Sequence, residues 1–128
     1  MLRVKTVKRK DPRDQASIEK FYLTSARQGS TDLKLLAERI AYQSTLTPGD
    51  CFNVLSALEK NVMDELNEGR TVHLGELGTF RVSVSSEGKL TNEELTVNAI
   101  KKAKILFRPS VGLRKMLKFM RFQKDKAA

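Results

Sequence analysis

The sequence predicts an α+β fold, and three patterns in its 128 residues lead to this class. Two segments, one ending near Gln43 and one between Thr47 and Gly69, place apolar residues at helical spacing. Residues 72–84 and 101–108 instead alternate apolar with polar or small side chains, which is the period of half-buried strands. A basic stretch after Pro109 returns to helical spacing, so a C-terminal helix completes the predicted order.

A basic extension, residues 1–29, precedes these elements. Residues 2–9 alternate apolar or β-branched side chains with Arg3, Lys5 and Lys8, which predicts a strand with one solvated, basic face. The Asp11-Pro12 pair ends this strand. Residues 19–28 are interpreted as a second extended segment, with a short helix as the alternative.

The first predicted helix follows this extension. Ser30 or Thr31 is the expected N-cap, and Asp32 then lies in the first turn, where its charge complements the helix dipole. The apolar stripe of this helix consists of Leu33, Leu36, Ala37 and Ile40.

The second predicted helix has strong start and stop signals. Thr47 is its expected N-cap, Pro48 its first residue, and Gly69 the glycine that ends it. One continuous apolar stripe runs along one side of this helix and consists of Cys51, Val54, Leu55, Leu58, Val62 and Leu66. This stripe offers more apolar surface than one short helix can cover, so it is expected to meet a partner chain.

A hairpin is predicted between Val72 and Phe80. Gly75 and Gly78 interrupt the alternation where the chain must reverse, because glycine reaches backbone angles that other residues avoid. The second strand continues to Val84, and residues 85–89 turn the chain. An acidic turn of helix capped by Thr91 is possible before the strand at residues 101–108.

The last helix begins after Pro109, with Ser110 as its expected cap. Its apolar stripe, which we expect to be buried, consists of Leu113, Met116, Leu117 and Met120. Residues 123–128 form a basic C-terminal tail that we expect to be frayed.

The charge is concentrated at the two ends of the chain. Residues 1–13 hold six Lys/Arg against one acid, and residues 101–128 hold ten against one, whereas the stretch between them has a net charge of −5. Such a distribution favours a polyanionic partner, nucleic acid before membrane, because no basic helix has a wide apolar face. The alternative is a pair of ends kept basic for solubility.

The sequence gives little support for a secreted, membrane, metal-binding or enzymatic protein. The single cysteine, Cys51, excludes an intramolecular disulfide and fits a reducing cytoplasm. No signal peptide or membrane-spanning segment is expected. His73 has no second ligand at metal spacing and is interpreted as a surface or cross-strand histidine. We expect no enzyme activity, no metal, no cofactor and no small-molecule substrate.

Two separated blocks of the sequence, together with the helices around them, resemble a known family. The block Gly75 to Phe80, GELGTF, is followed at matching distance by Phe107-Arg108-Pro109, and both lie between two helices and a terminal helix. This combination is similar to the HU/IHF family of bacterial histone-like DNA-binding proteins over about residues 31–122. The N-terminal strand and the segment NAIKKAKILFRP resemble, more narrowly, the HU-like proteins of Bacteroidetes-type bacteria.

The resemblance implies an IHF-like fold for residues 30–122. Two N-terminal helices of each subunit would form the body of a homodimer, and three strands would form a β saddle with a ribbon arm. The residues that this assigns to the dimer core are Val54, Leu55, Leu58, Val62, Leu66, Leu77, Phe80 and Phe107. The implied function is largely sequence-nonspecific binding of double-stranded DNA through the phosphate backbone, in the cytoplasm at the bacterial nucleoid.

The chain also departs from the family pattern. The arm-tip R-N-P motif is absent, and residues 83–99 hold Lys89 against three glutamates, so family-type intercalation is not supported. The expected DNA-binding residues are Arg81, Lys89, Lys101, Lys102, Lys104, Arg108, Arg114, Lys115, Lys118 and Arg121, with Arg3, Lys5, Lys8 and Arg9 as candidates on the N-terminal strand. The alternative function is a scaffold or protein–protein interaction module that has lost arm-mediated DNA bending.

Overall fold

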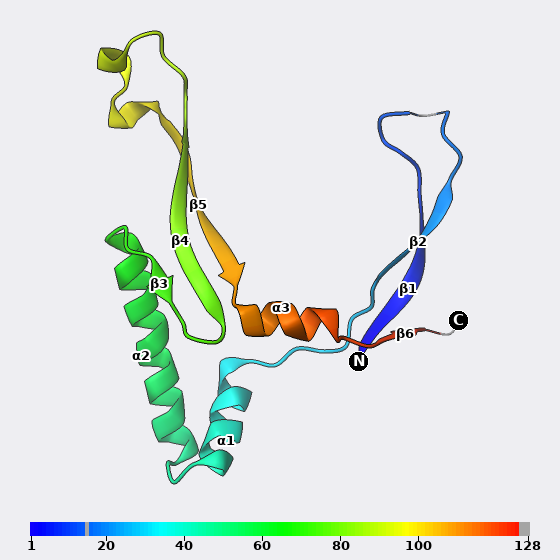
Figure 1. Cartoon of the computed structure of the whole chain (residues 1–128). Coiled ribbons are helices and arrows are strands. Elements are labelled where there is room, and N and C mark those ends of the chain that lie inside the picture. The colour runs from blue at the N-terminus through cyan, green and yellow to red at the C-terminus, as the bar shows by residue number, and fades with distance from the viewer. Residues whose placement is uncertain (15, 126–128) are drawn as a thin grey trace. The chain divides into compact units, whose positions relative to one another are not determined.

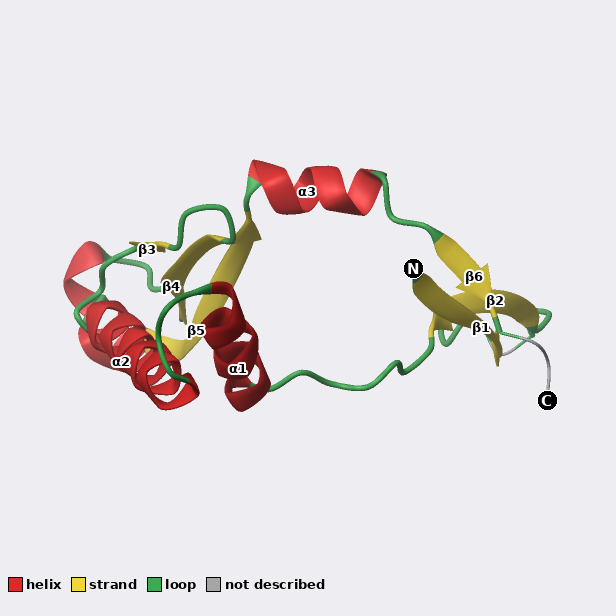
Figure 2. Ribbon diagram, turned by 90° about the horizontal axis from the view of Figure 1, so that it is seen from below, coloured by secondary structure: helices red, strands yellow, loops and turns green. Residues whose placement is uncertain are grey.

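The computed structural model describes residues 1–14 and 16–125. The chain is mixed α and β, as predicted, with three α-helices and two three-stranded sheets among these residues (Figures 1 and 2). It divides into two compact units: Met1–Thr31 with the residues from Met116 onward, and Asp32–Lys115, which we call the body. Each unit has its own sheet, so each is described by itself.

The first unit contains a small sheet, which we call the N-terminal sheet. It consists of β1 (Leu2–Arg9), β2 (Lys20–Ser25) and β6 (Phe122–Lys124), in the order β2-β1-β6. The predicted strand at residues 2–9 and the extended segment that follows it are confirmed as an antiparallel pair.

The third strand of this sheet was not expected. Gln123 and Lys124, predicted as part of a frayed tail, lie in β6, which pairs in parallel with β1. The Leu2 N–H donates to the Arg121 carbonyl at 2.8 Å, and the Asp125 N–H donates to the Val4 carbonyl at 2.8 Å. The remainder of the predicted tail, residues 126–128, lies outside the described residues. Because this pairing joins the two ends of the chain, no local pattern indicates it.

The body begins with two helices that pack against each other, α1 (Leu33–Gln43) and α2 (Pro48–Asn67). The N-cap of α1 is Asp32, whose Oδ1 accepts from the Leu35 N–H at 2.9 Å, and not Ser30 or Thr31 as predicted. Thr47 caps α2 as predicted, with its Oγ1 accepting from the Asp50 N–H at 3.1 Å. Gly69 follows the end of α2 with a φ of 77°, which completes the predicted stop.

The sheet of the body is antiparallel, in the order β3-β4-β5. Its strands are β3 (Val72–His73), β4 (Gly78–Ser86) and β5 (Ile100–Pro109), which confirms the hairpin and the returning strand. The turn between β3 and β4 uses two glycines with positive φ, 52° at Gly75 and 151° at Gly78. At its far end the ribbon of β4 and β5 continues into the loop of residues 87–99, which contains two short 3₁₀ turns (Figure 1).

The C-terminal helix, α3 (Val111–Lys118), is shorter than its apolar pattern suggests. The Ser110 hydroxyl accepts from the Leu113 N–H at 3.1 Å and donates to the Glu76 carbonyl, so it caps the helix as predicted. Met120 lies beyond the end of α3. Met116 and Leu117 are 50% and 54% exposed, so the expected buried stripe is not buried within the chain.

Gly78 is the most constrained glycine of the body. A Cβ at this residue would clash with the Arg108 carbonyl oxygen and would lie 2.7 Å from Cε2 of Phe107, and its φ of 151° disfavours any other residue. We expect Gly78→Ala to lower the free energy of unfolding by about 3 kcal/mol or more, since it combines backbone strain with overpacking. Urea unfolding followed by circular dichroism at a fixed protein concentration measures this loss.

The matched control is Gly75→Ala, whose Cβ would meet no atom within 4 Å. It retains only the cost of a positive φ, about 1 kcal/mol. Equal losses for the two variants would contradict the close approach of Gly78 to β5.

Few apolar side chains of the described residues are buried within the single chain. They are Ala37, Cys51, Leu66 and Ala99. Most residues of the predicted α2 stripe are partly exposed, with Val54 at 61% and Leu58 at 44%. This apolar surface is available to a partner chain.

Candidate nucleic-acid interface

The ribbon of β4 and β5 has two chemically different faces. Residues that pair directly across an antiparallel ladder place their side chains on the same side of the sheet. One side holds the pairs Phe80 with Phe107, Val82 with Ile105, and Val84 with Ala103. The other side holds Thr79 with Arg108, Arg81 with Leu106, Ser83 with Lys104, and Ser85 with Lys102. The first face is apolar, and the second is basic.

We call Arg81, Lys102, Lys104 and Arg108 the basic ribbon face. All four are exposed, and none of their partners in the ladder is acidic. Alternate residues of a strand lie about 6.6 Å apart, so Lys102 and Lys104 form a row of charges along β5. The ion pairs within the described part of the chain involve Arg3, Arg70 and Lys89, so the positive charge of this face is not neutralised there.

His73 lies beside this face at the edge of the sheet. It pairs with Thr79, and its Nδ1 lies 3.0 Å from the Thr79 Oγ1, as expected for a cross-strand histidine. A groove lined in part by His73, Arg81 and Arg108 runs across the base of the ribbon. The His73 imidazole and the Thr79 hydroxyl therefore accompany the cations as hydrogen-bonding groups, a feature that the sequence pattern alone did not assign to the site.

The other predicted DNA-binding residues of the body are arranged differently. Lys101 lies at the irregularity between Ser85 and Ser86, where Ser85 pairs with Lys102 and Ser86 with Ile100, so it has no partner opposite. Lys89 forms an ion pair with Glu87, Nζ to Oε2 at 3.3 Å. The loop that contains Lys89 therefore offers little free positive charge.

Three further predicted residues, Arg114, Lys115 and Lys118, are exposed on α3. Arg114 and Lys118 are four residues apart, so they lie on the same side of the helix. Arg121 follows the end of α3, where its carbonyl accepts from the N–H of Leu2. Register thus joins four of the ten predicted residues on one face, and helical spacing groups another two, Arg114 and Lys118.

The apolar face of the ribbon is partly covered by α2. The rings of Phe80 and Phe107 lie with their centroids 4.8 Å apart, and Leu66 near the end of α2 is buried. A groove between Met63, Leu66, Val82 and Ile105 remains open. Leu77 and Phe107, expected in a dimer core, are 57% and 46% exposed in the single chain.

In residues 1–14 and 16–125, no group of three or more His, Cys, Asp or Glu side chains is placed to hold a metal ion. None of the helices in this part of the chain is long and apolar enough to cross a bilayer.

Comparisons with known proteins give a family and a fold. Residues 1–124 match the model of the HU-HIG family, described as an HU domain fused to wHTH, Ig, or glycine-rich motif. The crystal structure of a candidate DNA-binding protein from Bacteroides vulgatus has a TM-score of 0.61 at 17% identity, over 96% of this chain and 47% of that one. This chain therefore spans about half the length of the Bacteroides protein.

A second solved structure is similar over a smaller share of the chain. Anabaena HU, in a cocrystal with DNA, has a TM-score of 0.55 at 15% identity, over 70% of this chain and 100% of that one. No curated protein matches the chain in sequence. At these identities the two structures establish a likeness of fold.

Proposed function

The chain belongs to the HU-HIG family, and from this membership we propose that it is a non-enzymatic, DNA-binding protein of the histone-like type. It binds double-stranded DNA with little sequence preference, through the phosphate backbone, and acts as a homodimer at the bacterial nucleoid. Residues 30–122 supply the HU-like domain, in which β3, β4 and β5 form one half of a saddle and the ribbon forms its arm.

The observation that carries this proposal is the basic ribbon face. Its four cations lie on one side of an antiparallel ladder with no acid among their partners. A row of unpaired cations on a two-stranded ribbon suits the regularly spaced charges of a phosphate backbone. Lys89 is not part of the proposed surface, because Glu87 neutralises it and Glu93 and Glu94 lie nearby in sequence.

The apolar surface supports the dimer. Val54 and Leu58 of α2 are left largely exposed by the single chain. An apolar patch of this kind marks an interaction surface, and a helical stripe is well suited to meet its own copy across a two-fold axis. The exposed members of the predicted core, Val54 and Leu58 among them, therefore belong to the proposed dimer interface.

A second candidate function is favoured by the loop at the end of the ribbon. Leu90 is 99% exposed and Val97 is 80% exposed, next to Glu87, Glu93 and Glu94. Exposed apolar residues among acids suit a basic protein partner better than DNA. If this loop is the functional surface, the domain acts as a protein-interaction scaffold.

The test of the first proposal is fluorescence anisotropy with two labelled duplexes of unrelated sequence, each about 30 base pairs long. Because backbone contacts carry no sequence information, we expect the two dissociation constants to agree within about threefold. A preference of more than about a hundredfold would instead require direct base readout. The scaffold function predicts no binding of either duplex.

A further inference from the structure

The positive charge of the chain lies mainly outside the body. The first 31 residues and the last 13 together hold twelve Lys/Arg against four Asp/Glu, a net charge of +8. Residues 32–115 hold twelve against eleven, a net charge of +1. Attraction to a polyanion should therefore depend strongly on the unit that contains the N-terminal sheet.

The N-terminal sheet separates its cations between two faces. In the ladder of β1 and β2, Arg9 pairs with Lys20, Val7 with Tyr22, and Lys5 with Thr24. Arg3 lies on the same side of β1, two residues before Lys5. We call Lys5, Arg9 and Lys20 the basic face of the N-terminal sheet. Lys8 and Lys124 belong to the opposite face, with Phe21 and Val4 as their partners.

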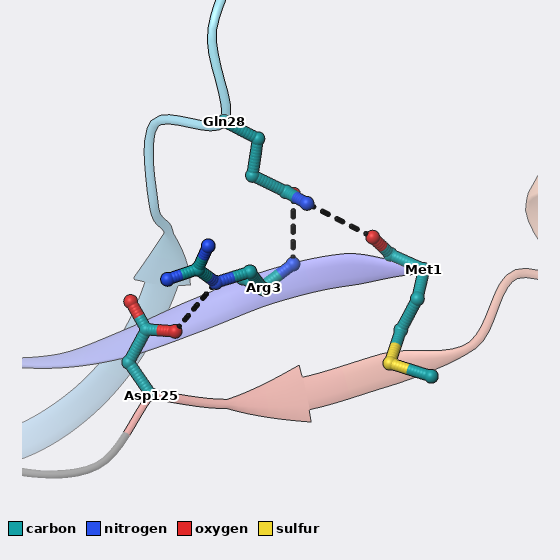
Figure 3. Close-up of polar contacts among 4 residues, drawn as sticks. All are labelled: Met1, Arg3, Gln28 and Asp125. Atoms are coloured by element: carbon teal, nitrogen blue, oxygen red, sulfur yellow. Dashed lines mark hydrogen bonds and ion pairs between the residues drawn. The ribbon is translucent and has the colours of Figure 1, made fainter.

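Arg3 is engaged within the unit and is left out of this set (Figure 3). Its Nε donates to the Asp125 Oδ1 at 2.9 Å, and its backbone N–H donates to the Gln28 Oε1 at 2.9 Å. The Gln28 amide in turn donates to the Met1 carbonyl at 3.1 Å. These bonds tie β1 to the segments after β2 and β6, so the charge of Arg3 is used to hold the sheet together.

Arg9 and Lys20 have no such partner among the described residues, and they face each other directly. Like charges opposite each other in a ladder destabilise it. An anion held between them would remove that repulsion. Beside Arg9 the surface forms a groove lined also by Lys10, Tyr22 and Thr24, with Asp11 as its acid. Hydroxyl donors thus accompany the cations, as in a site for phosphate oxygens.

We propose that the basic face of the N-terminal sheet is a second binding surface for the phosphate backbone of DNA, separate from the basic ribbon face. This inference rests on the proposed function and names the part of the chain that supplies much of its electrostatic affinity. Lys20, which lies on β2 and was not among the predicted DNA-binding residues, is a member of the site because of its register with Arg9.

The test compares two double variants of the full chain with equal loss of charge. Arg9→Gln with Lys20→Gln removes the facing pair, and Arg13→Gln with Arg27→Gln removes two exposed arginines of the same unit that lie outside the β1–β2 ladder. Each phosphate contact contributes about 0.9 to the slope of log affinity against log salt, so the first variant should lose about two units of slope and bind about 60-fold more weakly near 0.1 M salt. The second should lose no more than about threefold from its lower net charge.

Three outcomes decide the inference. Equal losses in the two variants would overturn the second surface and leave the proposed function standing. Failure of the wild-type protein to bind duplex DNA at low salt would overturn both. The variant Arg9→Lys with Lys20→Arg should keep wild-type affinity, and the glutamine pair should melt no lower than wild type because it relieves repulsion. If the glutamine pair melts at a lower temperature than wild type, and the charge-conserving variant also loses binding, these residues serve folding. That result would overturn the inference.

Discussion

Reversing Lys102, Lys104 and Arg108 to glutamate should weaken the binding of duplex DNA by more than about 500-fold. Three phosphate contacts correspond to a loss of roughly 500-fold at 0.1 M salt before any repulsion is added, and the new carboxylates add repulsion. The fold should survive, because all three side chains are exposed and their ladder partners are the small polar residues Ser85, Ser83 and Thr79. Anisotropy titration against a labelled duplex measures the loss.

The matched control reverses three exposed cations of the body that lie on its helices, Lys34, Arg39 and Lys60. This variant has the same net charge as the first but keeps the basic ribbon face. We expect a loss of about tenfold or less from the change in overall field. If the two triple variants bind equally weakly, charge alone decides affinity and the ribbon has no special role.

Leu58→Asp should convert the proposed dimer to a monomer and destabilise it. Leu58 lies within the apolar stripe of α2 and is 44% exposed in the single chain, so a partner chain would bury its remaining surface. An unpaired carboxylate in that interface costs about 3 to 5 kcal/mol, in addition to the lost apolar contact. Sedimentation equilibrium and urea unfolding at several protein concentrations measure the two effects.

Leu90→Asp is the control for this substitution. It makes the same chemical change at a residue that is 99% exposed in the loop, so association and stability should be unchanged. A wild-type protein that sediments as a monomer would contradict the dimer directly. Unchanged association of Leu58→Asp would show that the α2 stripe is not the interface.

The local signals of the sequence predicted the elements of the body well. Thr47 with Pro48 and Gly69 marked both ends of α2, because a cap, a proline at the first position and a following glycine act within one turn of helix. The start of α1 was misjudged because Ser30, Thr31 and Asp32 are all competent caps.

Features that depend on distant pairing were not predictable in this way. The strand β6 exists because Phe122–Lys124 pairs with β1 at the other end of the chain, and its three residues have no strand pattern of their own. The same limit applies to the candidate site. Composition identified the cations, but only the register of β4 with β5 shows that Arg81 and Lys104 share a face while Lys101 does not pair.

The apolar pattern also predicted α3 to be longer than it is. Leu113, Met116, Leu117 and Met120 have helical spacing, yet α3 ends at Lys118 and the chain enters β6 four residues later. Hydrophobic spacing indicates which residues would share one side of a helix. It does not indicate that the residues after the helix pair with a strand at the other end of the chain, which ends the helix earlier.

We propose that phosphate-backbone contacts hold DNA on the basic faces of this protein. The most direct test of this claim is anisotropy of the wild-type chain with one labelled duplex, repeated between about 0.05 and 0.2 M salt. We predict sub-micromolar affinity at the lower salt and a slope of log affinity against log salt of about −4 or steeper, as the four cations of the ribbon face require. Absence of binding at low salt, or binding that is indifferent to salt, would contradict the claim.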